Sequence, residues 1–225
     1  MKKLLAIVLL AATISSCKKN TDNTVIPNTS LCPVTAGSSW NYVRNSSDSA
    51  YRDSIYTFKA TDSTKTINNK TYNVFNSSAG SDVYYAITDS GFYRSGSLLA
   101  GLGIPELESF EELYLKKNPT KDSAWSTTLP ITYLGSPYTV KLTYAIPSIT
   151  DTLTVLGKNY SNLIHVNVVF STSVTFGTYT IPVSLGTGDF YYGKGIGLVS
   201  FVVTLSPPSG TAVTNTFNLK SYTVK

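Results

Sequence analysis

The sequence predicts an all-β protein built as an antiparallel meander. Apolar residues fall on every second position in Tyr56–Ala60, Val140–Tyr144 and Ile164–Phe170, and this period is typical of strands with one buried face. Thr, Val, Tyr and Ile, which favour strands, are frequent in these stretches. Turn-forming residues recur about every eight to fifteen residues, as expected for strands joined by hairpins. They include Asn68-Asn69, Asp89-Ser90-Gly91, Leu156-Gly157, Gly186-Thr187-Gly188-Asp189 and Pro207-Pro208-Ser209-Gly210.

The chain begins with a segment that is typical of exported proteins. Lys2 and Lys3 precede an apolar run from Leu4 to Ile14, which is shorter than the roughly 20 residues that a helix needs to cross a bilayer. A positive head, a short apolar core and small residues at the exit predict a secretory signal peptide that is cleaved. We therefore expect residues 1-16 to be absent from the mature protein.

The end of this segment, Ile14-Ser15-Ser16-Cys17, resembles the lipobox of bacterial lipoproteins. The resemblance implies that Cys17 receives a diacylglyceryl group and becomes the acylated first residue of the mature chain. Each buried methylene contributes about 0.8 kcal/mol, so two or three chains anchor a protein durably in a membrane. Lys18 stands where this family carries Asp to retain a protein in the inner membrane. The resemblance thus implies an outer-membrane location, on the periplasmic face or at the cell surface.

Residues 17-30 are expected to connect this anchor to the folded body. The segment from Lys18 to Ser30 is polar, rich in Asn and Thr, and contains Pro27, a composition that predicts a flexible tether. As a flexible coil it would reach about 20 Å. The body would then stand just clear of the lipid headgroups.

The body divides into two related halves, which we expect to span residues 31-118 and 119-225. Three blocks occur in both halves in the same order: a strand containing Trp, a hairpin that ends in Lys-x-Tyr, and a Tyr-Tyr strand. The paired residues are Trp40 and Trp125, Lys70 and Lys158, and Tyr84-Tyr85 and Tyr191-Tyr192. The longer spacing before Tyr191 predicts an extra hairpin within Val168–Gly188.

The two halves are expected either to pack as a two-sheet sandwich or to join in one open barrel-like sheet. Their order of Trp, Gly-Lys-x-Tyr and Tyr-Tyr blocks is similar to the Tyr-rich β modules of envelope lipoproteins. One segment departs from the strand pattern. Residues 105-113 start with Pro105 and repeat Leu107, Phe110 and Leu113 at three-residue spacing, which predicts a short helix. The alternative is a loop that leads into a strand at Leu113–Lys116.

Composition excludes some classes of function. The charge is low, with 18 Lys and Arg against 13 Asp and Glu, and the basic residues are scattered. No nucleic-acid-binding face is therefore predicted. If Cys17 carries lipid, Cys32 has no partner for an intrachain disulfide, and we expect it to be a small buried residue.

Few residues support catalysis. His165 is the only histidine and is predicted to lie on the outer face of its strand. Asp151 could orient it to activate a serine, but no Gly-x-Ser-x-Gly motif presents that serine. The glutamates near residue 110 could form a paired-carboxylate site, although on a helix they would form a solvated face. These glutamates are Glu106, Glu108, Glu111 and Glu112. We therefore predict that the protein is not an enzyme.

No metal or cofactor is predicted. One His and one free Cys do not make a zinc site, and the spacing of Asp48 and Asp53, with Asp62 alone, does not match a calcium loop. The glycines of Gly193-Lys194-Gly195-Ile196-Gly197 precede a strand-like stretch rather than a helix, so they predict a tight turn and no phosphate loop.

The aromatic residues are the remaining candidates for a binding site. Sixteen tyrosines exceed what a core of this size needs, and tyrosine presents an apolar face with a polar rim to sugars or proteins. Tyr84, Tyr85, Tyr191 and Tyr192 would place one ring of each pair on either side of the sheet. We therefore expect a lipid-anchored envelope protein with a non-enzymatic binding or structural domain and a protein or glycan partner. The alternatives are a lipid or lipoprotein carrier with an apolar cavity and an envelope hydrolase.

Overall fold

The computed structural model describes residues 30–48, 54–78, 80–96, 110–133, 136–176, 178–206 and 211–225, except for the side chains of residues 131–133, 136–138 and 174–176. Within these ranges the chain forms twelve β-strands in one sheet, so the predicted all-β fold is confirmed. The strands are β1 (Ser39–Ser46), β2 (Ser54–Ile67), β3 (Lys70–Ser77), β4 (Val83–Ile87), β5 (Gly91–Ser95), β6 (Glu111–Lys116), β7 (Ala124–Tyr133), β8 (Ser136–Val155), β9 (Lys158–Phe176), β10 (Tyr179–Gly193), β11 (Gly197–Leu205) and β12 (Val213–Thr223).

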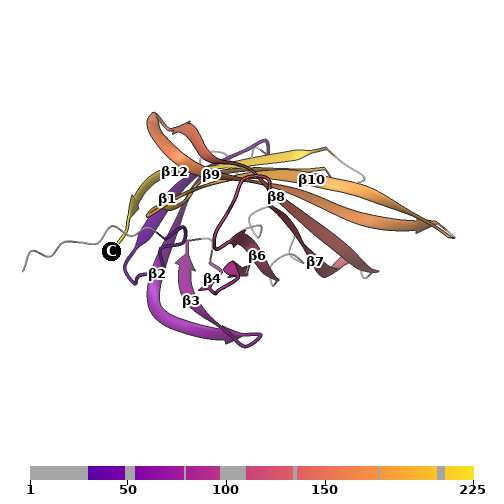
Figure 1. Cartoon of the computed structure of the whole chain (residues 1–225), viewed down its shortest axis with the longest axis horizontal. Coiled ribbons are helices and arrows are strands. Elements are labelled where there is room, and N and C mark those ends of the chain that lie inside the picture. Colours follow the sequence, from indigo (N-terminus) through magenta and orange to yellow (C-terminus); the bar gives the residue numbers. More distant parts are fainter. Residues whose placement is uncertain are drawn as a thin grey trace, which may run out of the picture.

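The described strands pair antiparallel in the order β6-β5-β4-β3-β2-β1-β12-β11-β10-β9-β8-β7. Each half of the chain supplies six consecutive strands, and β1 pairs with β12 to join the halves. The sheet curls until its edge strands β6 and β7 come close, so the observed arrangement is the barrel-like sheet and not the sandwich (Figure 1). The boundary predicted between residues 118 and 119 falls in the connection between β6 and β7.

The inner face of the sheet carries most of the core. In β9 the side chains of Ile164, Val166, Val168 and Phe170 are buried, and His165 lies on the opposite face, as the alternation predicts. A sheet of this many strands encloses more space than its aliphatic side chains fill. Aromatic rings occupy much of that space.

The segment that precedes β1 also fills the interior. Leu31 and Cys32 are buried in the core although they belong to no strand. The backbone N–H of Gly195, in the β10–β11 turn, donates to the carbonyl of Ser30 over 2.9 Å. The chain therefore enters the barrel at the end where this turn lies.

The short helix predicted near 105-113 is not formed at its C-terminal end. Glu111–Lys116 make up β6 and pair with β5, while residues 105–109 lie outside the described ranges. Pairing with β5 buries Tyr114 and Leu115, and this burial outweighs the local preference of glutamate for a helix. None of the described segments is a helix long and apolar enough to cross a membrane.

Most predicted turns lie where expected. Asn68-Asn69 and Leu156-Gly157 have φ angles of 46° and 61° and of 48° and 79°. Two left-handed residues in succession are typical of two-residue hairpin turns, here between β2 and β3 and between β8 and β9. Gly193-Lys194-Gly195 forms the expected turn before β11. Residues 207–210 lie outside the described ranges.

One prediction about the region before Tyr191 is wrong, because Gly186–Asp189 is part of β10 and not a turn. The extra residues within Val168–Gly188 lengthen β9 and β10, and the hairpin predicted there is the tip of the β9–β10 hairpin, with Phe176 opposite Tyr179. Gly186 belongs to a β-bulge, where the register with β9 shifts between Ser184 and Gly186. A Cβ on Gly186, at φ 146°, would come within 2.1 Å of the carbonyl oxygen of Thr204. Glycine is thus needed where β10 leaves β11 and continues beside β9 alone.

Gly186→Ala is expected to lower the free energy of unfolding by about 3 kcal/mol, because the new methyl group collides with the Thr204 backbone. Gly157→Ala is the matched control. Its φ is also positive, but a Cβ there would meet nothing within 4 Å, so we expect a loss of about 1 kcal/mol. Urea unfolding followed by circular dichroism measures both. Equal losses would contradict the role of the Thr204 contact.

Candidate functional site

A cavity lies inside the barrel-like sheet and is lined by both halves of the chain. The volume in which the centre of a water-sized molecule fits is about 80 Å³. A single water needs roughly 10–15 Å³ of such volume, so the cavity is large enough for more than one. Its walls are mainly aromatic, and Ser77 and Ser81 are among the few polar residues that line it. The rings include Trp40, Phe58, Phe75 and Tyr85 from the first half and Tyr192 and Phe217 from the second.

Neighbouring rings of the wall touch one another. The centroid of Tyr114 lies 5.9 Å from that of Tyr85 and 5.6 Å from that of Tyr192, so three tyrosines from β6, β4 and β10 form a row. Such spacings are favourable for aromatic pairs. The row joins the two halves of the chain on the inner face of the sheet.

Two polar atoms of the wall are bonded to the main chain. Trp40 Nε1 donates to the carbonyl of Ile196 over 2.6 Å, and the Tyr42 hydroxyl donates to the carbonyl of Leu198 over 2.7 Å. Because these groups already have partners, the rings offer the cavity their apolar faces. The cavity is therefore suited to an apolar molecule.

A buried ion pair lies at one end of the cavity. Arg94 of β5 and Glu112 of β6 are 4% and 3% exposed, and Arg94 Nε donates to Glu112 Oε1 over 2.6 Å. A second donor of the guanidinium, Nη2, also bonds Oε1, and the Tyr144 hydroxyl donates to Oε2. Arg94 lines both the main cavity and a smaller one that continues toward Val168 and Phe170.

Burial and pairing act in opposite directions on these groups. Burial alone would lower the pKa of Arg94, but the Glu112 carboxylate raises it, so the guanidinium stays charged. Burial and then Glu112 raise the pKa of Tyr144, and burial raises the pKa of Tyr85 to about 12. The Arg94 guanidinium therefore remains charged beside Glu112 at neutral pH.

The solvated face predicted for the glutamates is wrong for Glu112. The prediction assumed a helix, whereas in strand β6 successive side chains alternate between the two faces of the sheet. Glu112 points inward and Glu111 outward. Glu106 and Glu108 lie outside the described residues. Arg94 was missed because nothing in the sequence connects it to a carboxylate 18 residues later.

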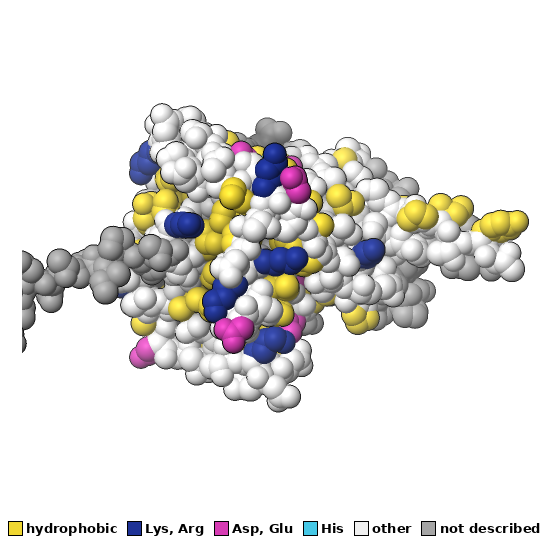
Figure 2. Space-filling model, in the orientation of Figure 1, with side chains coloured by type: hydrophobic (Ala, Val, Ile, Leu, Met, Phe, Trp, Pro, Cys, Tyr) yellow, Lys and Arg dark blue, Asp and Glu magenta, His cyan; other side chains and the backbone are white. Residues whose placement is uncertain are grey.

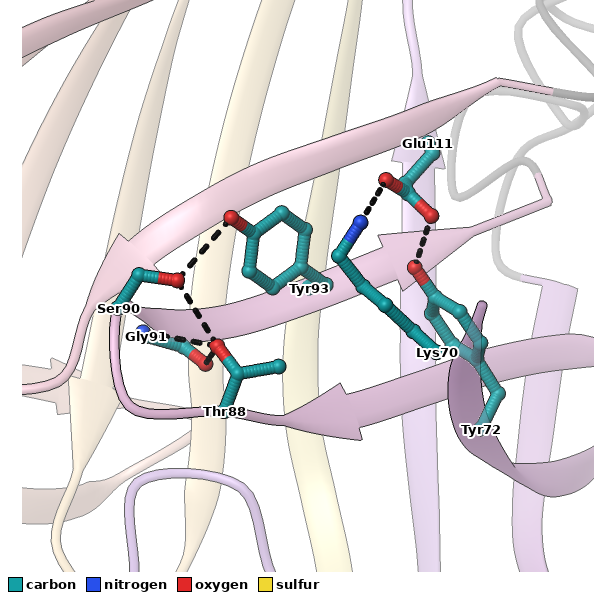
Figure 3. A network of polar contacts seen from close by, with 7 residues as sticks. All are labelled: Lys70, Tyr72, Thr88, Ser90, Gly91, Tyr93 and Glu111. Atoms are coloured by element: carbon teal, nitrogen blue, oxygen red, sulfur yellow. Dashed lines mark hydrogen bonds and ion pairs between the residues drawn. The ribbon is translucent and has the colours of Figure 1, made fainter. Parts of the chain in front are cut away.

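The same alternation places Glu111 on the outer face of the sheet, where its side chain contacts the β2–β3 hairpin (Figure 3). Its carboxylate accepts hydrogen bonds from Lys70 Nζ and from the Tyr72 hydroxyl, both at 2.6 Å. Burial alone would raise the pKa of Glu111, but the bonds from Lys70 and Tyr72 lower it. Lys70 Nζ also lies 4.7 Å from the ring centroid of Tyr93.

The four tyrosines predicted to face a ligand lie on both faces of the sheet. One ring of each Tyr-Tyr pair points inward and the other points outward. Tyr85 and Tyr192 line the cavity. Tyr84 and Tyr191 lie on the outer face, where Lys65 Nζ sits 4.7 Å from the ring centroid of Tyr84 and the His165 ring stacks on Tyr191 at 4.5 Å. The outward rings are thus partly covered by their own neighbours. Cys17 lies outside the described residues.

His165 is held between two carboxylates. Its Nε2 is 2.8 Å from Asp189 Oδ1 and its Nδ1 is 3.4 Å from Asp151 Oδ2. Asp151 is the residue that the sequence suggested could orient His165, whereas Asp189 was missed because the β9–β10 register could not be derived from the sequence. Both ring nitrogens face acids, so neither is directed at a serine as a general base would be.

Two further observations concern reactive groups. Cys32 is buried, as expected, and burial raises the pKa of its thiol to about 11, so the thiol is not reactive at neutral pH. Within the described residues, no three His, Cys, Asp or Glu side chains are grouped so that they could hold a metal ion.

A second buried arginine, Arg44, lies beside the cavity wall. Its Nε and Nη2 donate to Asn215 Oδ1 over 2.9 and 2.7 Å, and its Nη1 donates to the Tyr56 hydroxyl over 3.1 Å. The guanidinium carbon also lies 5.6 Å from the ring centroid of Phe217. Tyr56 and Phe217 line the cavity, so these contacts help to fix the positions of two wall residues.

No protein-family model and no curated protein matches this sequence. Three crystal structures have a similar arrangement of the chain. A candidate lipoprotein from Parabacteroides distasonis is 13% identical, with 87% of this chain and 99% of that chain covered and a TM-score of 0.51. A candidate exported protein with a YmcC-like fold from Bacteroides fragilis is also 13% identical, with coverages of 85% and 97% and a TM-score of 0.46.

The third structure is the hypothetical lipoprotein YmcC from Escherichia coli, at 8% identity, coverages of 88% and 90% and a TM-score of 0.39. At these identities a likeness concerns the fold alone, and among these three structures only the one from Parabacteroides has a TM-score above 0.5. The curled antiparallel sheet is therefore a fold that also occurs in a crystal structure.

Glu112→Ala is expected to lower the free energy of unfolding by about 3–5 kcal/mol, because it leaves the Arg94 guanidinium buried without its counter-ion. Asp89→Ala is the matched control. It removes the carboxylate of an exposed ion pair with Lys117, and we expect no measurable change. Denaturant unfolding followed by tryptophan fluorescence compares the two. A Glu112→Ala protein as stable as the control would contradict the pairing.

Proposed function

We propose that this chain is a lipid-anchored protein of the cell envelope whose barrel-like body binds a small apolar ligand without catalysing a reaction on it. The aromatic cavity carries this proposal. It is lined mainly by aromatic rings, and the polar atoms of Trp40 and Tyr42 already bond the main chain, a composition common in sites for small apolar molecules. The carrier with an apolar cavity is thus favoured over a purely structural domain.

The lipid anchor is supported by Ile14-Ser15-Ser16-Cys17 and by the positive, apolar segment before it. The fold shared with a candidate lipoprotein from Parabacteroides distasonis agrees with this assignment. Lys18 after the acylated residue supports transport to the outer membrane. The ligand would then be a molecule that is met in the envelope.

Binding without catalysis is supported by the partners that the titratable side chains already have within the protein. Glu112 is bonded by Arg94 and Tyr144, and His165 lies between Asp151 and Asp189. Neither group is directed at an open position where a substrate could exchange a proton. A hydrolase is therefore the least favoured of the three functions.

Recognition of a glycan or protein by outward tyrosines is less favoured than ligand binding in the cavity. Lys65 lies over Tyr84 and His165 stacks on Tyr191, so a sugar ring could not stack on those covered faces. The scattered basic residues do not support binding to nucleic acid.

Cys17→Ser is expected to abolish lipidation and to release the protein from the membrane fraction, because the hydroxyl cannot form the thioether. Mass spectrometry of the N-terminal peptide of the wild-type protein should show Cys17 as the acylated first residue. Cys32→Ser, which changes the other cysteine, should leave both results unaltered. An unmodified Cys17 in the mature protein would disprove the anchor.

Val83→Trp is expected to weaken binding of an apolar fluorescent probe at least about tenfold, because the larger ring occupies the cavity that Val83 lines. N-phenyl-1-naphthylamine is a suitable probe, and its fluorescence increase on transfer to an apolar site gives the Kd. Ser161→Trp, on an exposed serine outside the cavity, should bind as the wild type does.

Circular dichroism checks that both variants fold. If Val83→Trp does not, Ser81→Trp tests the same cavity from an exposed lining position. Absence of probe binding to the wild type, or equal binding by the cavity and control variants, would contradict the proposed site.

A further inference from the structure

The β9–β10 hairpin extends beyond the rest of the barrel. The register of β10 with β11 begins at Gly186, and that of β9 with β8 begins at Thr172. Between these positions residues 173–176 and 179–184 form a ribbon of two strands, and no third strand among the described residues pairs with either edge. We call this ribbon the arm. Figure 1 shows the hairpin projecting away from the body, on the side opposite to the C-terminus.

The arm has one apolar and one polar face. Directly opposed residues in an antiparallel pair share a face, so Phe176 and Tyr179, Val174 and Ile181, and Thr172 and Val183 occupy register positions on one side. Ser173 and Pro182 occupy the other side. We call the first side the apolar face.

The described side chains of the apolar face on β10 are open to solvent, and this face continues the inner face of the barrel. Tyr179 is 76% and Ile181 51% exposed, and Figure 2 shows hydrophobic side chains at the end of the projection. Thr172 and Phe170, which follow on the same side of β9, are buried. A two-stranded ribbon is marginally stable in water by itself, so an exposed face of this kind indicates a surface that is covered when the protein functions.

The absence of charged residues from the arm indicates what kind of surface covers it. From Val166 to Gly188 the sequence contains no Asp, Glu, Lys, Arg or His. A protein interface usually surrounds its apolar centre with polar and charged residues, whereas tyrosine beside aliphatic residues suits the boundary between headgroups and acyl chains. The observations therefore favour a lipid surface over a protein partner.

We propose that the apolar face of the arm docks on the bilayer in which the protein is anchored. Ser30, where the tether meets the body, contacts Gly195 just past the C-terminal end of β10, whereas Tyr179 is the first residue of that strand. Fifteen residues of strand place these ends about 45 Å apart. A tether that reaches about 20 Å then requires the body to lie along the membrane for the arm to touch it.

This orientation rests on the lipid anchor proposed above, but the docking is tested separately from the anchor and the cavity. The lipidated full mature protein, with Thr178→Cys labelled by an environment-sensitive fluorophore, is reconstituted in phosphatidylcholine vesicles that contain spin-labelled lipid. Thr178 is exposed at the end of the arm, and the buried Cys32 thiol does not compete for the label at neutral pH. Quenching of the fluorophore by the spin-labelled lipid measures contact of the arm with the bilayer.

We expect strong quenching in the wild-type background and a loss of about tenfold or more in the arm–bilayer equilibrium for Ile181→Asp, since burial of one such side chain contributes at least that factor. Ser173→Asp places the same charge on the polar face of the arm and should retain the quenching. Quenching should also persist when the cavity is filled by Val83→Trp, which separates this proposal from ligand binding.

Two results would overturn the docking. One is a label that stays unquenched on vesicles to which the protein is demonstrably bound through acylated Cys17, which would assign the arm to a protein partner instead. The other is an equal loss of quenching in Ile181→Asp and Ser173→Asp, which would show that the two faces do not differ.

Discussion

Side chains bridge the gap between the edge strands β6 and β7, and the carboxylate of Glu112 is central to this bridge. Because the charge is buried, it must be neutralised, and Arg94 on β5 and Tyr144 on β8 provide its partners. Trp125 of β7 stacks on Tyr144 at 5.0 Å and donates from Nε1 to the carbonyl of Leu113 on β6 over 2.7 Å. These contacts hold the two ends of the curled sheet together and shelter its interior.

The interior that results is aromatic rather than aliphatic. A sheet of twelve strands encloses a wide space, which large flat side chains and the entering segment at Leu31-Cys32 fill only in part. An apolar pair in place of Arg94 and Glu112 would avoid the free energy of desolvating two charges. The Glu112 carboxylate, however, also accepts the hydrogen bond from the Tyr144 hydroxyl, and this bond connects β6 to β8 across the closure.

The two ends of the barrel differ: the chain enters at one end, and the arm projects from the other. At one end Ser30 enters beside the Gly193–Gly195 turn and its neighbours fill the interior. At the other end β9 and β10 continue past the Gly186 bulge, so that the inner face becomes an exposed surface. The face that the arm exposes is the same side of β9 and β10 that carries Phe170 and Phe190, which line the smaller cavity.

Local patterns in the sequence determined which residues form strands and which side of each strand is buried. Alternation in Ile164–Phe170 correctly separated the buried residues from His165, and the turns at Asn68-Asn69 and Leu156-Gly157 follow from residue types that accept left-handed backbone conformations. Alternation also separated Tyr84 from Tyr85 and Tyr191 from Tyr192. Only the tertiary structure decided that the strands close into one sheet, that Glu112 meets Arg94 and Tyr144, and that Gly186 is a bulge. Those features depend on contacts between residues far apart in the chain, and a period of two residues carries no information about partners at such distances.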